Sequence, residues 1–125
     1  MKTLVIDSSG WLEYFIGGRH AKTYLKHIES AKAIWLPAIV LYEVYKKFAQ
    51  EKSESEGLLA ITQMEQQSKG VVVLDERLAL FAADTSLRHK LPMADAIIYA
   101  TALEKEAVLL TSDRHFKGLK NVVLI

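Results

Sequence analysis

The sequence contains no cysteine, and this absence excludes disulfide bonds and metal sites built on thiolates. A chain without disulfides fits a reducing compartment, so we expect an intracellular, cytoplasmic protein. Long apolar runs are absent as well, because no stretch approaches the ~20 apolar residues that a membrane-spanning helix needs. The first residues lead directly into a strand-like segment instead of a signal peptide, so we expect neither secretion nor a membrane partner.

Neither sign of charge predominates. The chain has 16 Lys and Arg residues against 15 Asp and Glu residues, a formal net charge of +1. This total neither indicates nor excludes a nucleic-acid partner, and only local clustering of charge can do so. With 125 residues, 50% of them hydrophobic and 25% charged, the chain is expected to form one domain, residues 1–125. A domain of this size buries roughly two thirds of its unfolded surface.

Strand-like and helix-like segments alternate along the chain. Strands are predicted at 3–6, 33–36, 71–74, 107–111 and 122–125. Helices are predicted after a cap at Ser8 or Ser9, ending before Gly17, and then at 19–30, 39–52, 54–68, 75–89 and 93–106. No repeat or linker interrupts this order. The alternation predicts an α/β sandwich in which helices cover a mostly parallel sheet.

Apolar spacing also predicts which helix faces are buried. In the second predicted helix, Tyr24 and Leu25 are expected to face inward. In the fourth, the helical spacing runs through Leu58 and Ile61, with Leu59 beside them. We therefore expect these side chains to contribute to the core.

Two of the predicted strands run into an aspartate. The first ends at Asp7, and the fourth passes through Ser112 into Asp113. Continuous aliphatic runs are typical of parallel strands buried on both faces, and ligands of such sheets bind outside the carboxyl ends of the strands. Each aspartate can also simply cap the helix or turn that follows it.

Two further carboxylates lie on apolar helices. Glu43 borders the buried stripe of its helix, four residues after Ile39 and three after Val40. A carboxylate there is costly unless it is paired or bound to a cation, although it can also extend from the edge of the stripe into water. Asp95 lies in the first turn of an almost entirely apolar helix, where the macrodipole alone stabilises an acid by ~0.3–1 kcal/mol. Both residues thus have a structural and a functional interpretation.

If these four carboxylates converge, their mutual repulsion favours a bound divalent cation. Oxygen ligands indicate Mg²⁺ or Mn²⁺, and the four histidines of the chain lack compact metal-ligand spacing. Such a site suits phosphoryl transfer. Lys46 and Lys47 follow Glu43 by one turn, and Arg114 directly follows the fourth acid. A negative pocket rimmed by positive charge is what a phosphodiester substrate needs.

Four sequence blocks, taken in order, resemble a known family. They are D-S-S-G-W-L-E-Y-F after the first strand, the helical Y-E-V, the block L-P-M-A-D-A-I-I-Y-A-T-A and the closing L-L-T-S-D-R-H-F. Together they resemble a PIN domain, and the size and style of the chain are most similar to the VapC-type toxins of prokaryotic toxin–antitoxin pairs. The resemblance covers essentially the whole chain. Glu106, where the family often has glycine, departs from it at a turn and not at the site.

The resemblance implies a PIN-like three-layer sandwich whose five strands are ordered 3-2-1-4-5. It also implies a Mg²⁺- or Mn²⁺-dependent ribonuclease for single-stranded RNA, usually homodimeric and blocked by a cognate antitoxin. The acidic site implied for this chain comprises Asp7, Glu43, Asp95 and Asp113. The three aspartates would hold the metal, and Glu43 would complete the cluster or orient the attacking water. Ser8 and Ser112 match the supporting hydroxyl positions of the family.

Three alternatives are considered. A phospho-acceptor receiver domain has a similar architecture and an acidic Mg²⁺ pocket, but it requires paired acids after the first strand, an acceptor aspartate after the third and a lysine after the fifth. Here Asp7 stands alone and no lysine follows the fifth strand. A second alternative is a PIN-fold binding module that has lost catalysis. The presence of all four acids in this chain argues against it. A PIN nuclease that processes RNA without being a toxin stays open, and a small upstream gene for a DNA-binding protein would favour the toxin.

Overall fold

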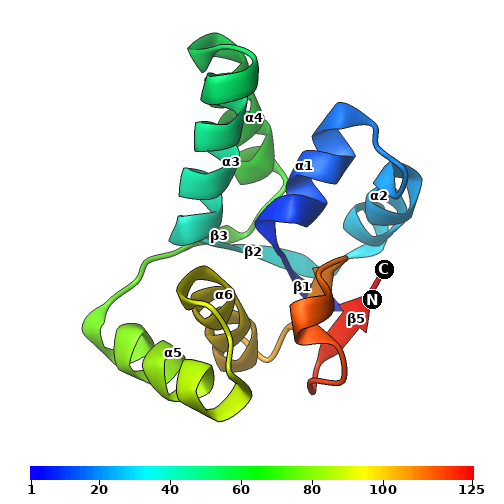
Figure 1. Cartoon of the computed structure of the whole chain (residues 1–125). Coiled ribbons are helices and arrows are strands. Elements are labelled where there is room, and N and C mark those ends of the chain that lie inside the picture. Colours follow the sequence, from blue (N-terminus) through cyan, green and yellow to red (C-terminus); the bar gives the residue numbers. More distant parts are fainter.

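Five parallel strands form one sheet in the order β3-β2-β1-β4-β5, which confirms the order implied by the resemblance. All four neighbouring pairs are parallel, where the sequence predicted a mostly parallel sheet. The computed structural model describes residues 1–125 (Figure 1). In chain order the elements are β1 (Thr3–Ile6), α1 (Ser8–Ile16), α2 (Ala21–Ser30), β2 (Ala33–Pro37), α3 (Ala38–Glu51), α4 (Glu54–Gln66), β3 (Gly70–Val72), α5 (Glu76–His89), α6 (Met93–Glu104), β4 (Val108–Thr111), the 3₁₀ helix η1 (Arg114–Phe116) and β5 (Val122–Leu124).

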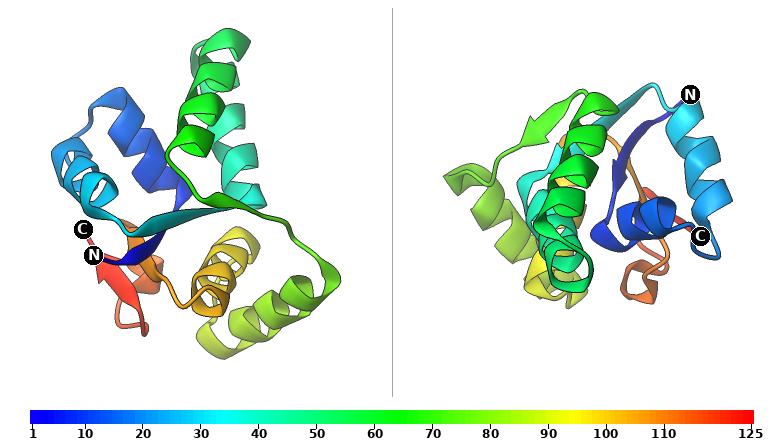
Figure 2. Two further views of the ribbon diagram at one scale, coloured as in Figure 1. Left: turned by 180° about the vertical axis from the view of Figure 1, so that it is seen from behind. Right: turned by 90° about the horizontal axis from the view of Figure 1, so that it is seen from above.

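Helices cover both faces of the sheet. Figure 1 shows α1 to α4 on one side and α5 with α6 on the other, and the reverse view in Figure 2 agrees. α6 packs directly on β1, β2 and β4, and α5 packs on α6. This arrangement buries the central strands on both sides, as parallel sheets require. None of these helices has the length and apolar character needed to cross a membrane.

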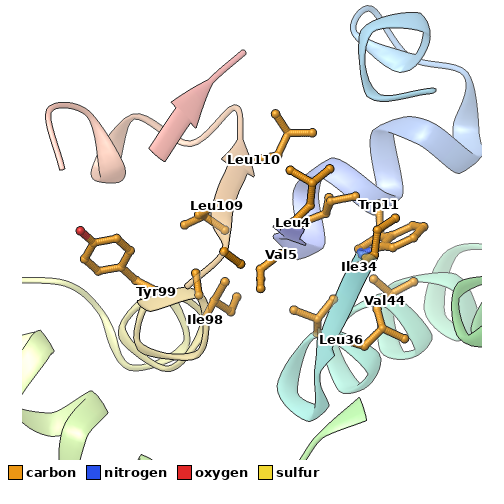
Figure 3. Packing of buried hydrophobic residues seen from close by; sticks show 14 of the residues in the cluster. Leu4, Val5, Trp11, Ile34, Leu36, Val44, Ile98, Tyr99, Leu109 and Leu110 are labelled. Carbon is orange, nitrogen blue, oxygen red and sulfur yellow. The ribbon is translucent and has the colours of Figure 1, made fainter. Parts of the chain in front are cut away.

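β1 lies at the centre of the hydrophobic core because β2 and β4 flank it. Leu4, Val5 and Ile6 are all buried. Successive side chains point to opposite faces, and Figure 3 shows Leu4 on the side of Trp11 and Val5 on the side of Ile98. Each fully buried aliphatic side chain contributes ~1.5–3 kcal/mol. The carboxyl end of β1 is therefore held in a fixed position.

The sequence offered two kinds of cap for α1, a serine at position 8 or 9 and the aspartate before them. The structure places the N-cap at Asp7, whose side chain accepts a hydrogen bond from the Gly10 backbone N–H, and not at Ser8 or Ser9. The carboxylate one residue earlier reaches the free N–H groups of the first turn, and aspartate is among the strongest capping residues. Both serines become residues of the helix itself.

Two other local predictions are wrong. Leu25 is exposed, because Tyr24 takes the fully buried position on α2. β3 ends at Val72, so the predicted strand residues Val73 and Leu74 lie outside it and are exposed. As the outermost strand, β3 pairs on one side only, which leaves fewer contacts to extend it.

α4 buries a face shifted from the one predicted, because of the three predicted side chains only Ile61 packs against the core. Leu58 and Leu59 are 60% and 58% exposed. The buried residues are instead Gly57, Ala60 and Met64. A Cβ atom on Gly57 would lie 2.9 Å from the ring of Tyr45 in α3, so the absence of a side chain permits the close approach. The close contact with α3 at Gly57 therefore sets which face of α4 is buried, and the apolar pattern of α4 does not predict it.

Candidate active site

The four acids that the sequence singled out line one pocket at the carboxyl edge of the sheet. The pocket has a volume of about 360 Å³. Its lining comprises Asp7, Ser8, Ser9, Leu12, Glu43, Lys47, Asp95, Ile98 and Asp113. The acids come from four places in the fold: the end of β1, the helices α3 and α6, and the residue before η1. Their convergence is thus a product of topology and not of proximity in the sequence.

Asp7 is the most buried of these acids, with 5% of its surface exposed. Its Oδ1 accepts a hydrogen bond from the Gly10 backbone N–H at 2.9 Å, and its Oδ2 accepts one from Thr111 Oγ1 at 2.5 Å. Ser9 Oγ lies 3.0 Å from both carboxylate oxygens. Burial raises the pKa of Asp7, the three donors oppose the rise, and the negative charge of Asp113 adds to it. A nearby cation would therefore stabilise this carboxylate.

Glu43 faces the pocket from α3. Ser8 Oγ donates a hydrogen bond to Glu43 Oε1 at 2.5 Å. The bond connects the start of α1 to α3, so it restricts the direction in which the carboxylate points. The supporting hydroxyl expected at Ser8 thus lies against Glu43 and not against the neighbouring Asp7.

Asp95 and Asp113 meet at a histidine. His115 Nδ1 lies 3.1 Å from Asp95 Oδ2 and 3.3 Å from Asp113 Oδ1. Possible ligand atoms of these three residues all lie within 4.8 Å of one another. Burial raises the pKa of Asp95, the hydrogen bond with His115 lowers it, and the charge of Asp113 raises it. Since the charge of Asp113 acts on both Asp7 and Asp95, the three carboxylates share one electrostatic environment.

Hydroxyl groups organise the end of β4. Thr111 is fully buried, donates to Asp7 and accepts a hydrogen bond from the Asp113 backbone N–H at 2.9 Å. Ser112 Oγ lies 2.6 Å from the Tyr24 hydroxyl of α2. Burial raises the pKa of Tyr24 to about 12, so this hydroxyl keeps its proton at neutral pH. Thr111 therefore ties Asp7 to Asp113, and Ser112 ties the same loop to α2.

The donor set fits a divalent cation. Carboxylate oxygens are the ligands that Mg²⁺ and Mn²⁺ prefer in proteins. The family resemblance implied Asp7, Asp95 and Asp113 as the metal ligands. The structure groups Asp95 and Asp113 with His115, and places Asp7 and Glu43 in the same pocket outside that group.

Of the three basic residues predicted to contact substrate, only Lys47 lines the pocket, and its Nζ pairs with Glu51 at 2.5 Å. Lys46 turns toward Tyr42, with Nζ 3.4 Å from the Tyr42 hydroxyl. Arg114 is exposed at the start of η1 and does not line the pocket.

Sequence reasoning missed His115 and Thr111. The backbone N–H of His115 donates to Asp113 Oδ1 at 2.9 Å, so the turn after β4 folds this ring back toward the acids. The available signal was a histidine two residues after a strand-end aspartate. For Thr111 the signal was a single hydroxyl at the end of the otherwise aliphatic run V-L-L-T.

A sequence model of the PIN domain matches residues 4–122. No curated protein sequence matches the chain.

Solved toxin–antitoxin proteins share the fold. A toxin–antitoxin complex from Klebsiella pneumoniae gives a TM-score of 0.80 at 23% identity, covering 96% of this chain and 95% of that chain. VapC20 from Mycobacterium tuberculosis, a Sarcin-Ricin loop cleaving toxin, gives 0.75 at 16% identity, covering 95% and 96%. VapBC2 from Rickettsia felis, bound to a DNA fragment from its promoter, gives 0.74 at 13% identity, covering 98% and 97%. At these identities the likeness concerns the fold alone.

Proposed function

The chain belongs to the PIN domain family, and on this premise we propose that it is a Mg²⁺- or Mn²⁺-dependent endoribonuclease for single-stranded RNA, the toxin of a type II toxin–antitoxin pair. In this proposal residues 1–125 form one nuclease domain. The observation that carries the proposal is the convergence of Asp7, Glu43, Asp95 and Asp113 in one pocket. Clustered carboxylates destabilise a fold unless a cation offsets their repulsion, so the cluster is better explained by a ligand than by structure.

Asp7, Asp95 and Asp113 would hold the cation. Bound there, Mg²⁺ or Mn²⁺ would activate a water and neutralise charge on the phosphate. A carboxylate has about four acceptor positions, so the hydrogen bonds from Ser9, Gly10 and Thr111 orient Asp7 and still leave an acceptor position for a cation.

Glu43 would orient the attacking water. Its Oε1 accepts the hydrogen bond from Ser8, which leaves Oε2 to accept one from a water in the pocket. Ser112 would act indirectly, because its contact with Tyr24 restrains the loop that carries Asp113.

The substrate would contact the basic residues near the pocket. Lys47 in the lining would attract a phosphate, and Lys46 and Arg114 would extend the positive charge outside it. An RNA substrate is supported by the similar fold of VapC20, a Sarcin-Ricin loop cleaving toxin.

The proposed partner is a cognate antitoxin in the cytoplasm. The similar folds solved in toxin–antitoxin complexes support this partner. An inhibitory segment should place an Arg or Lys among the acids, because a side-chain cation can replace the charge of the metal. A complex with full inhibition but no partner side chain in the pocket would contradict this mechanism.

We also propose a homodimer formed through α5 and α6. A second pocket of about 540 Å³ lies there, and eight of its nine lining residues are hydrophobic. Leu87 and Met93 in its lining are 81% and 74% exposed, which is costly for a free surface. Leu87→Glu should convert the dimer to a monomer in light scattering, whereas Leu58→Glu on α4 should not. A monomeric wild-type protein would contradict the proposal.

The nuclease proposal is tested by incubating the purified chain with labelled single-stranded RNA, with and without EDTA. We expect cleavage that EDTA abolishes and that Mg²⁺ or Mn²⁺ restores. A double-stranded RNA of the same sequence should be cut more slowly.

Asp95→Asn is the control for contaminating nucleases. The variant should remain folded by circular dichroism and lose cleavage. Cleavage that survives both EDTA and this substitution would show that the acidic pocket is not the nuclease site.

A further inference from the structure

His115 contacts two acids of the pocket from outside its lining, and the roles proposed above do not use this imidazole. The other three histidines lie elsewhere: His20 is at the N-terminus of α2, His27 borders a hollow beside Met1 and Lys2, and His89 packs against Tyr99. His115 Nδ1 points between two carboxylates, whose nearest oxygens lie 3.1 and 3.3 Å away.

These distances match the spacing of ligands around one ion. Six ligands in octahedral geometry lie ~2.1 Å from a small divalent cation, so neighbouring ligand atoms are roughly 3 Å apart. The two distances from Nδ1 to the oxygens of Asp95 and Asp113 are close to this value. Ligand atoms of the three residues all lie within 4.8 Å of one another, so one ion can contact the nitrogen and both oxygens once the side chains close around it.

The backbone places this ring. The His115 N–H donates to Asp113 Oδ1 at 2.9 Å, which fixes the turn that carries the imidazole. In the metal-free site Nδ1 donates its proton to the carboxylates, so a cation that binds there must displace this proton. The side chain is 63% exposed, so Nε2 can carry the ring proton in contact with water and leave the Nδ1 lone pair to the cation. This is the tautomer that a metal ligand needs.

We propose that His115 Nδ1 is a metal ligand beside Asp95 and Asp113, and that it makes the site prefer Mn²⁺ to Mg²⁺. The proposal rests on the metal dependence proposed above. Mg²⁺ and Mn²⁺ both favour oxygen ligands, but Mn²⁺ is a transition-metal ion and accepts an imidazole nitrogen more readily than Mg²⁺ does. Replacing one oxygen in the ligand set by nitrogen therefore costs Mg²⁺ more than it costs Mn²⁺.

Binding of each metal to the purified full-length chain, measured by isothermal titration calorimetry, tests the preference. His115→Phe should raise the dissociation constant of Mn²⁺ by at least about tenfold and that of Mg²⁺ by less than about threefold. His115→Asn, which can offer an oxygen instead, should bind Mg²⁺ like the wild type and lose the preference for Mn²⁺. His27→Phe, at a distant histidine, should change neither constant.

Pulsed electron paramagnetic resonance of bound Mn²⁺ tests the contact itself. Wild type and His27→Phe should show modulation from a directly bound nitrogen, and His115→Phe should not. Circular dichroism checks that the variants are folded. We expect His115→Phe to fold, because the His115 side chain is largely exposed and few contacts are lost.

The results separate this proposal from the proposed function. If the wild type binds Mn²⁺ without nitrogen coupling, or if His115→Phe weakens both metals equally, His115 is only a hydrogen-bond partner of the acids and the proposal is wrong. If the wild type binds neither metal, the metal-dependent function fails with it.

Discussion

The ends of β1 and β3 look alike locally, yet only one of them lies at the pocket. Asp7 Oδ1 accepts a hydrogen bond from the Gly10 N–H at 2.9 Å, and Asp75 Oδ1 accepts one from the Leu78 N–H at 2.9 Å. Both residues have extended backbones and both are N-caps, of α1 and α5. By local geometry the two aspartates are equivalent.

The difference lies in their neighbours. β1 is the middle strand and pairs with β4, so Asp7 receives a hydrogen bond from Thr111 and lies near the charge of Asp113. β3 is an edge strand, two steps from β1, or roughly 10 Å at ~4.8 Å per step. Asp75 does not line the acidic pocket. Strand order therefore decides which of the two capping aspartates can bind the same cation as the other acids of the pocket.

The largest effect on RNA cleavage is expected at Asp113, because its charge acts on both Asp7 and Asp95. Asp113→Asn should lower metal-dependent RNA cleavage by more than about 100-fold, because groups that merely support a metal ligand are already worth ~10–100-fold. Cleavage rates under single-turnover conditions measure it. If folded Asp113→Asn cleaved RNA at the wild-type rate, Asp113 would have no role in the active site.

The link between the two strand ends is tested at Thr111. Thr111→Val should lower the free energy of unfolding by ~1–3 kcal/mol, because the buried Asp7 Oδ2 loses this donor and the half-buried Asp113 N–H loses its acceptor. Urea unfolding measures the change. Thr111→Ser keeps the hydroxyl and should recover much of the loss. Equal stability of Thr111→Val and wild type would mean that the hydroxyl does not tie the two strands.

Asp7→Asn should leave the metal-free protein at least as stable as wild type at neutral pH. The folded-state pKa of Asp7 is raised, mainly by burial, so ionised Asp7 opposes folding. Metal-free wild-type stability should fall as pH rises from 3.8, the ordinary value, through the raised pKa, and the advantage of Asp7→Asn should grow over that window. Thermal unfolding in EDTA at a series of pH values measures it. A large loss of stability at pH 7 would indicate a purely structural cap.

The smallest effect is expected at Asp75. Asp75→Asn should match the wild-type free energy of unfolding, because asparagine caps a helix as well as aspartate does. Asp75→Ala should cost ~1 kcal/mol through the lost cap. Chemical denaturation of both variants measures these differences. If Asp75→Asn stabilised the metal-free protein in the manner expected of Asp7→Asn, the two strand ends would not differ as proposed.

The sequence allowed prediction of the four acids and of the alternating elements because both depend on local pattern. Asp7 and Asp113 follow aliphatic strands, and Asp95 interrupts an apolar helix. The sheet order came from the family resemblance. The hydrophobic pattern could not identify the buried face of α4. Gly57 is buried because it has no side chain to collide with Tyr45, and not because it is hydrophobic.

Two site residues required the three-dimensional structure. His115 reaches Asp95, 20 positions earlier in the chain, through the turn after β4. Thr111 reaches Asp7 across a strand pair, 104 positions away. Neither contact follows from spacing along the chain, since the first depends on how α6 packs beside β4 and the second on how β4 pairs with β1.

Mn²⁺-dependent cleavage of single-stranded RNA by Asp7→Asn and Asp75→Asn, purified and assayed in parallel, tests most directly whether strand order selects the working aspartate. We predict that Asp75→Asn cleaves at the wild-type rate and that Asp7→Asn loses at least about tenfold in rate across the Mn²⁺ titration. Equal losses in the two variants, or a loss confined to Asp75→Asn, would contradict this account.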